Sequence, residues 1–147
     1  MKYDVAELHR AVVGRLADAE QQYTTNRRIV VETLAGAARP LTLPDLLRRS
    51  PSLAQSSAYR SLTILMDAGV VRRLSHGADH GHYELAEQLT QHHHHLICDG
   101  CGSVADVTLP DHIEHAMDDS FVAVAELFGF VPERHAVDIF GRCEQCR

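Results

Sequence analysis

The sequence predicts an α+β protein in which an N-terminal winged helix-turn-helix domain is followed by a small C-terminal α/β domain. Apolar residues recur at helical spacing as far as residue 68, and two strand-like runs then follow at 70–74 and 82–85, around a turn at 77–81. Beyond residue 91 the pattern is strand, strand, helix, strand. We therefore expect a first domain over residues 1–85, a hinge over 86–91 and a second domain over 92–147.

Four helices are expected in the first domain. The first covers residues 4–22, where the apolar residues at helical spacing are Val5, Leu8, Val12 and Leu16. The second starts near Thr24 or Thr25, either of which can cap it, and ends at Gly36. The third starts after Thr42, with a proline and an acid in its first turn, and stops at Ser50. The fourth covers 55–68 and turns four residues inward, namely Ala58, Leu62, Leu65 and Met66.

The second domain is predicted to hold strands at 92–97, 103–107 and 136–140 and one helix over 111–128. The helix residues expected to face the core of this domain are Ile113, Met117, Val124 and Leu127. At about 55 residues the domain is too small to bury a sufficient core by itself. We therefore expect a structural metal and a partner subunit.

Charge separates the two domains further. The chain of 147 residues has a net charge of -6, yet residues 24–73 carry eight arginines against three acidic residues, whereas residues 92–147 carry three basic against ten acidic residues. A basic segment fits contact with phosphates, and an acidic, histidine-rich segment fits the binding of cations. No apolar run approaches the roughly 20 residues of a membrane span and no secretory signal is visible, so we expect a cytoplasmic protein without membrane contact.

Four cysteines form two Cys-x-x-Cys pairs, Cys98 with Cys101 and Cys143 with Cys146. This spacing lets two thiolates reach one ion from a tight turn, and sulfur ligands in tetrahedral geometry favour zinc. Disulfides are uncommon in the cytoplasm, which makes a redox role the weaker interpretation. We therefore predict one structural zinc per chain, which joins the first strand of the second domain to its last.

Four consecutive histidines precede the first cysteine pair. Side chains alternate along an extended segment, so His93 and His95 face one side and His92 and His94 face the other. Alternate imidazoles can therefore serve two different metals.

The expected partners of these histidines come from elsewhere in the chain. Glu84 lies just before the hinge, on the face of the wing strand that also carries His80 and His82. A metal held by Glu84, His93 and His95 would fix the angle between the two domains, as a metal-dependent switch requires. The set expected on the other side is His92, His94, Glu114 and His135.

The segment 54–62 is expected to form the second helix of the helix-turn-helix. The side chains near its exposed N-terminal end are Ser56, Ser57, Tyr59 and Arg60. Such side chains read base edges in the major groove of double-stranded DNA, where arginine pairs with guanine and an aromatic face packs on the thymine methyl group. Arg27 and Arg28 are expected to flank this helix and contact phosphates.

At these residues the chain resembles the ferric uptake regulator family of metal-dependent repressors, over nearly its full length. The matching segments are Tyr23-Thr24-Thr25-Asn26-Arg27-Arg28, Ser57-Ala58-Tyr59-Arg60-Ser61-Leu62, residues 92–107 and Ile139-Phe140-Gly141-Arg142-Cys143 with Cys146. The resemblance implies a homodimer that binds a palindromic operator when loaded with metal and releases it when metal is scarce. It also implies that the four cysteines hold the structural zinc and that Tyr59 contacts a base.

The resemblance implies two further metal sites. The regulatory site near the hinge is matched by Glu84, His93 and His95. The additional metal site in the dimerisation domain is matched by His92, His94, Glu114 and His135. The regulatory histidine that many members have before the third helix has no counterpart at residues 38–41, and the cysteine of zinc-sensing members is absent from 84–91. The fourth regulatory ligand therefore stays open among His82, His80, His76 and Asp106.

Two regulatory functions stay open. Zinc or ferrous iron is the expected sensed ion, although imidazole and carboxylate ligands also accept manganese and nickel. Nickel-sensing members have histidines where this chain has Arg72 and Arg73, which disfavours nickel. Asp106 matches the aspartate of the peroxide-sensing branch, so the alternative is a peroxide sensor with iron held by histidine and aspartate. No hydrolase motif such as H-E-x-x-H is present, and we do not expect an enzyme.

Overall fold

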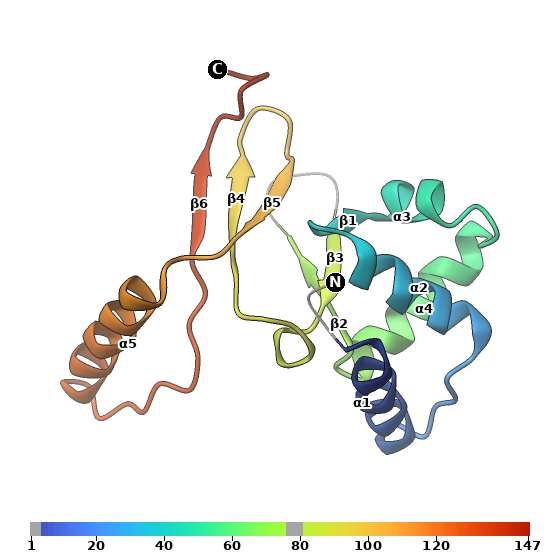
Figure 1. Ribbon diagram of the computed structural model, residues 1–147, viewed down its shortest axis with the longest axis horizontal. Coiled ribbons are helices and arrows are strands. Elements are labelled where there is room, and N and C mark those ends of the chain that lie inside the picture. The colour runs from blue at the N-terminus through green and yellow to red at the C-terminus, as the bar shows by residue number, and fades with distance from the viewer. Residues whose placement is uncertain (1–3, 76–80) are drawn as a thin grey trace. The chain divides into compact units, whose positions relative to one another are not determined.

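The computed structural model describes residues 4–75 and 81–147 and divides the chain into two compact units, Met1–His92 and His93–Arg147. The elements of the first unit are α1 (Val5–Asp18), α2 (Thr25–Gly36), β1 (Leu41–Thr42), α3 (Leu43–Arg49), α4 (Gln55–Asp67), β2 (Val71–Leu74), β3 (His82–Leu85) and the short 3-10 helix η1 (Glu87–Leu89) (Figure 1). The elements of the second unit are β4 (His94–Cys98), β5 (Val104–Val107), α5 (Asp111–Glu126) and β6 (Asp138–Gly141).

The first three helices begin where the sequence places capping side chains. Asp4 accepts hydrogen bonds from backbone N–H groups at the start of α1, and a threonine does the same at the start of α2 and of α3. α1 ends at Asp18, earlier than expected, because Glu20 takes a left-handed conformation (φ 57°) that does not continue a helix. α4 ends just before Gly69, which has φ 71°. No helix in the described part of the chain is long and apolar enough to cross a membrane.

The core of the first unit lies between its helices and an antiparallel sheet of order β1-β3-β2. The predicted inward residues of α1 and α4 are buried, except that Val5 is exposed in the first turn and Met66 is half-buried. β1 was not predicted, because two residues are too few to show an alternation. Most of the expected turn at 77–81, together with His76 and His80, lies outside the described residues.

The second unit contains the predicted strands and helix. β4 is the middle strand of a sheet of order β5-β4-β6, antiparallel to β5 and parallel to β6 (Figure 1). α5 connects β5 to β6. Because of these directions, the end of β4 lies beside the start of β5 and beside the end of β6. The order and direction of the strands therefore decide where the metal-binding side chains gather.

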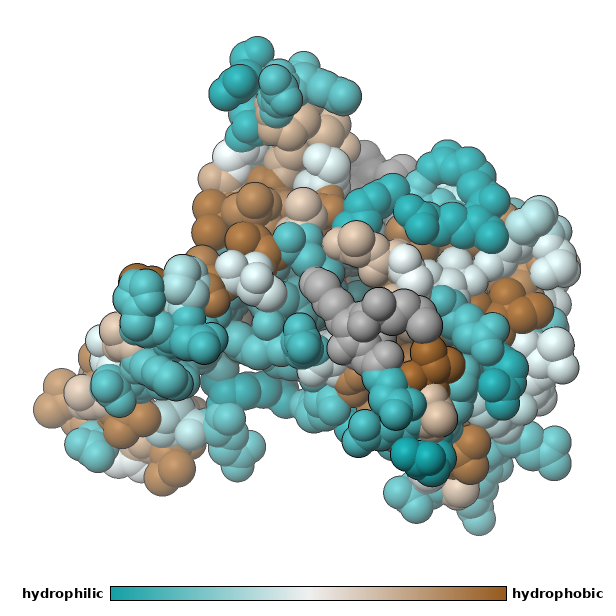
Figure 2. Space-filling view, in the orientation of Figure 1, coloured by the Kyte–Doolittle hydropathy of each residue, from teal (hydrophilic) through white to brown (hydrophobic). Residues whose placement is uncertain are grey.

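The prediction that α5 buries an apolar face is wrong for the single chain. α5 has no buried residue, and Val124 and Leu127 expose 57% and 83% of their surface. Other exposed apolar residues of this unit are Leu96, Ile113, Phe121, Val122, Phe128, Phe130, Val131, Ile139 and Phe140. Figure 2 shows hydrophobic residues over α5 and over the strands of this unit. Helical spacing identifies an apolar stripe but not the surface that covers it, and one chain does not cover this stripe.

Candidate metal centres

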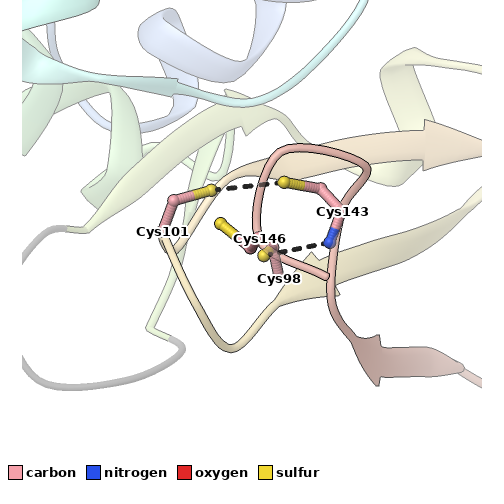
Figure 3. A group of neighbouring side chains, drawn as sticks. All are labelled: Cys98, Cys101, Cys143 and Cys146. Carbon is pink, nitrogen blue, oxygen red and sulfur yellow. Dashed lines mark hydrogen bonds between the residues drawn. The ribbon is translucent and has the colours of Figure 1, made fainter.

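The four cysteines meet at one end of the second unit's sheet (Figure 3). Cys98 ends β4 and Cys101 follows in the turn to β5, while Cys143 and Cys146 follow β6. Because β4 and β6 are parallel neighbours, the two pairs emerge at the same edge. The four sulfur atoms lie within 4.8 Å of one another, and all four cysteines are free thiols. The fold thus brings together the four residues that the sequence predicted as a zinc site.

The spacing of the sulfur atoms fits tetrahedral zinc. Cys101 Sγ lies 3.8 Å from Cys143 Sγ, which matches the edge of about 3.8 Å in a tetrahedron with zinc–sulfur distances of about 2.3 Å. The backbone N–H groups of Gly100 and Cys143 donate to Cys98 Sγ at 3.3 and 3.2 Å. Backbone hydrogen bonds from Cys143 and Cys101 lower the pKa of the Cys98 thiol to about 6, which favours the thiolate that binds a metal.

Gly100 allows the two cysteine turns to approach each other. A Cβ atom at this position would meet Cys146 Cβ at 2.7 Å and Cys146 Sγ at 2.9 Å. Both distances are shorter than side-chain contacts allow, so a larger residue would displace a zinc ligand. Within Cys98-Asp99-Gly100-Cys101 the two thiols are the candidate ligands, and Gly100 leaves the space that Cys146 needs to approach them.

The register of the three strands lines up a histidine with two aspartates. His95 on β4 lies opposite Asp106 on β5 and opposite Asp138 on β6. The Nε2 atoms of His93 and His95 both lie 3.8 Å from Asp106 Oδ1, and the two rings are nearly perpendicular with centroids 5.1 Å apart. Two imidazoles and one carboxylate therefore converge within the second unit. Of the residues considered for the fourth regulatory ligand, Asp106 is the one that the second unit places here, whereas His82 belongs to the first.

Asp138 orients the ring of His95. Nδ1 of His95 lies 3.2 Å from Asp138 Oδ1, and the tautomer that donates this N–H turns the Nε2 lone pair toward Asp106. A carboxylate behind the ring is the usual support of a metal-binding histidine. The sequence did not reveal this contact, because the two residues are 43 positions apart and meet only through the register of β4 and β6.

The other face of the histidine run carries a second convergent set. His94 is buried, and its Nε2 lies 2.9 Å from Glu114 Oε1. His135 Nε2 lies 3.3 Å from the other oxygen of the same carboxylate, and the two imidazole rings stack with centroids 5.3 Å apart. Asp118 Oδ1 lies 2.9 Å from His135 Nδ1 and supports that ring from behind. Three of the four residues predicted for the additional site therefore meet, from β4, α5 and the segment before β6.

The remaining predicted ligands belong to the first unit. His92 is its last residue and contacts Glu87 of η1. Glu84 lies on β3, directly opposite Arg72 on β2, and the two side chains form an ion pair. His82 is buried on β3 and faces the same side as Glu84 by alternation.

The residues predicted to contact DNA lie on α4 and α2. On α4 the exposed side chains are Ser56, Tyr59 and Arg60, with Ser57 half-buried. No side chain of the described residues caps the N-terminus of α4, and uncapped N–H groups at a helix start are suited to a phosphate. On α2, the Arg28 guanidinium lies 4.9 Å above the ring of Tyr23, and Arg27 binds the carbonyl of Gln22.

Comparison with known proteins decides the family. The model described as the ferric uptake regulator family matches residues 18–137, which is most of the chain. The chain belongs to this family. The α+β, two-domain architecture and the resemblance predicted from the sequence are confirmed. Members of the ferric uptake regulator family are dimeric transcriptional repressors that bind metal and DNA.

The similar proteins include regulators named for peroxide and for iron. The peroxide operon regulator of Bacillus subtilis (strain 168) is 24% identical over 135 residues, which cover 89% of this chain and 88% of that protein. The ferric uptake regulation protein of Legionella pneumophila is 31% identical over 102 residues, 69% of this chain and 70% of that protein. The crystal structure of the Vibrio cholerae ferric uptake regulator is 25% identical and has a TM-score of 0.69, with 89% of this chain and 98% of that one covered.

Proposed function

We propose that this protein represses metal-homeostasis genes in response to an ion held at a hinge site by Glu84, His93, His95 and Asp106. The observation that carries the proposal is the convergence of His93, His95 and Asp106 in the second unit, immediately after the hinge. Glu84 lies on the last strand before the hinge. Ligands on both sides of the hinge give the ion a different affinity for each angle between the domains, which is what a metal switch needs.

The donor chemistry supports zinc or ferrous iron at the hinge and zinc at the cysteines. Imidazoles combined with carboxylates accept zinc, iron, manganese and nickel. Four thiolates at tetrahedral spacing are soft ligands that select zinc, one ion per chain, which would stabilise the second domain rather than sense metal supply. In this proposal the soft cysteine site stabilises the domain and the harder histidine and carboxylate site senses the metal.

A third ion is assigned to the additional site in the dimerisation domain. The proposed ligands are His92, His94, Glu114 and His135. Glu114 supports this assignment because its two oxygens face Nε2 of His94 and Nε2 of His135. His92 is two residues from His94 along the chain and is the ligand nearest to the hinge.

The proposed DNA complex is a homodimer on a palindromic operator. A two-fold dimer presents two α4 helices, which fit half-sites one turn of DNA apart, at about 34–36 Å. The exposed apolar stripe on α5 supports dimerisation through the second domain. Metal at the hinge would fix the spacing of the two α4 helices and thereby raise the affinity for the operator.

Replacing Tyr59 with alanine is expected to weaken operator binding by about 1–3 kcal/mol, because a base contact is lost. The free energy of unfolding should hardly change, since 61% of this side chain is exposed. Fluorescence anisotropy with a labelled operator at fixed salt measures the affinity, and a thermal melt checks the stability. Thr63→Ala, one turn further along α4, is the matched control. Normal operator affinity in Tyr59→Ala would remove this residue from the interface.

A peroxide sensor is the second candidate function, and one observation favours it. An aspartate, Asp106, is the carboxylate placed beside both His93 and His95, and the peroxide operon regulator of Bacillus subtilis is similar to this chain. Ferrous iron at this site would activate peroxide beside a ligand imidazole, and peroxide itself would be the two-electron oxidant of that imidazole. One oxygen atom would replace a ring hydrogen, the other would leave as water, and the modified histidine would bind metal less well.

Mass spectrometry separates the two functions. The iron-loaded protein is treated with hydrogen peroxide and digested, and the peptides that contain His93 and His95 are weighed. The manganese-loaded protein is the control. A metal sensor is expected to keep these peptides unmodified. A gain of one oxygen atom in the iron form alone would show the peroxide sensor instead.

A further inference from the structure

The ion pair between Arg72 and Glu84 occupies the carboxylate that the proposed hinge site needs. The two residues lie directly opposite each other on neighbouring antiparallel strands, β2 and β3. Arg72 Nε lies 2.6 Å from Glu84 Oε1, and a terminal nitrogen of the same guanidinium lies 2.5 Å from that oxygen. The Glu84 side chain is 9% exposed and that of Arg72 is 31% exposed. The pair is therefore a close contact in which the carboxylate is buried and the guanidinium is partly exposed.

The burial of Glu84 determines what the pair does. A carboxylate withdrawn from water needs a positive partner, and removing one member of a buried pair leaves the other at a high cost. Arg72 fills this role in the metal-free chain. A metal ion bound by Glu84 would be repelled by the guanidinium on Oε1 of the same carboxylate, since both are cations.

We propose that Arg72 is an internal competitor of the sensed ion and sets the metal concentration at which the hinge site fills. Metal binding through Glu84 must weaken the ion pair, and the free energy lost in doing so is subtracted from the affinity for the ion. The inference rests on the proposed role of Glu84 as a ligand. The residue that lies across the wing from a metal ligand thus tunes the sensor without binding the metal.

The test is a zinc titration of the full chain with its structural zinc in place. Zinc is competed against a chromophoric chelator in the absence of DNA, in a His135→Ala background that disables the additional site. Arg72→Met keeps an unbranched apolar stem but removes the charge, and it is expected to bind zinc about tenfold more tightly at the hinge. Arg72→Lys keeps the charge but loses the planar guanidinium. Its zinc affinity should lie between that of the parent protein and that of Arg72→Met.

Two further variants make the result specific. Arg73→Met removes the neighbouring arginine, which is exposed and lies opposite Tyr83, and it should leave the zinc affinity unchanged. Glu84→Gln should weaken zinc binding, and adding Arg72→Met to Glu84→Gln should then have no further effect, because the competitor has lost its target. Thermal melts of all variants show that each is folded before its affinity is used.

The outcomes separate the inference from the function on which it rests. If Glu84→Gln weakens zinc binding but Arg72→Met binds zinc like the parent, Glu84 is a ligand and the competitor role of Arg72 is overturned. The same holds if Arg72→Met tightens binding equally with and without Glu84. If Glu84→Gln leaves zinc affinity unchanged, the ligand assignment in the proposed function is wrong and the inference falls with it.

Discussion

Replacing Cys143 with serine is expected to release the structural zinc, one ion per chain, and to destabilise the second domain more than any other single change. Cys143 contributes twice, through a sulfur 3.8 Å from Cys101 Sγ and through a backbone N–H that donates to Cys98 Sγ. Structural zinc contributes about 10 kcal/mol or more to the folding of small domains, and this domain has an uncovered helix and a short sheet. A serine hydroxyl is a poor substitute for a thiolate at such a site.

Zinc content and thermal stability measure this effect together. The purified variant is analysed for zinc after dialysis and is heated with and without a chelator, beside the parent protein. Gln145→Ser is the matched control, because it places the same residue in the same turn at an exposed position without removing a ligand. A variant at Cys143 that keeps its zinc and its melting temperature would contradict the cysteine site.

Replacing both His93 and His95 with alanine is expected to abolish the gain in operator affinity that metal confers, while the structural zinc stays bound. The two Nε2 atoms face one carboxylate oxygen, and no other pair of imidazoles in the described second unit faces Asp106. Couplings between an effector and a second ligand are typically about 1–3 kcal/mol, and the double variant should lose all of that gain.

Operator anisotropy with and without added metal measures the coupling. His112→Ala combined with His115→Ala is the matched control, because it removes two exposed imidazoles from α5 and leaves the convergent sets intact. The control should respond to metal like the parent. A double variant at His93 and His95 that still gains operator affinity on metal addition would show that the hinge site does not carry the response.

Features encoded within a few residues were predictable from the sequence. The capping residues Asp4, Thr24 and Thr42 lie immediately before the helices that they start, and their hydrogen bonds are local. A Cys-x-x-Cys pair likewise brings its ligands together within one turn. The alternation of the four histidines into two pairs is also local, and the structure gives His94 and His95 different partners, Glu114 and Asp106.

Contacts that depend on the exact register of neighbouring strands or on the placement of α5 were not predictable. The supports of the metal-binding histidines, Asp138 and Asp118, are placed by strand register and by α5, which the sequence does not specify at the level of single residues. The contact between Arg72 and Glu84 depends in the same way on the register of β2 and β3. Periodicity predicts that α5 has an apolar face but not which surface covers that face, and in the single chain the face is uncovered.

Filling the hinge site is expected to make the dimer bind its operator. The most direct measurement is operator affinity while a dimer that carries only its structural zinc is titrated separately with zinc, ferrous iron, manganese and nickel. Operator affinity should rise as the sensed ion binds and should fall again when a chelator removes that ion. An operator affinity that is the same with and without each of the four ions would show that metal binding does not control the DNA complex.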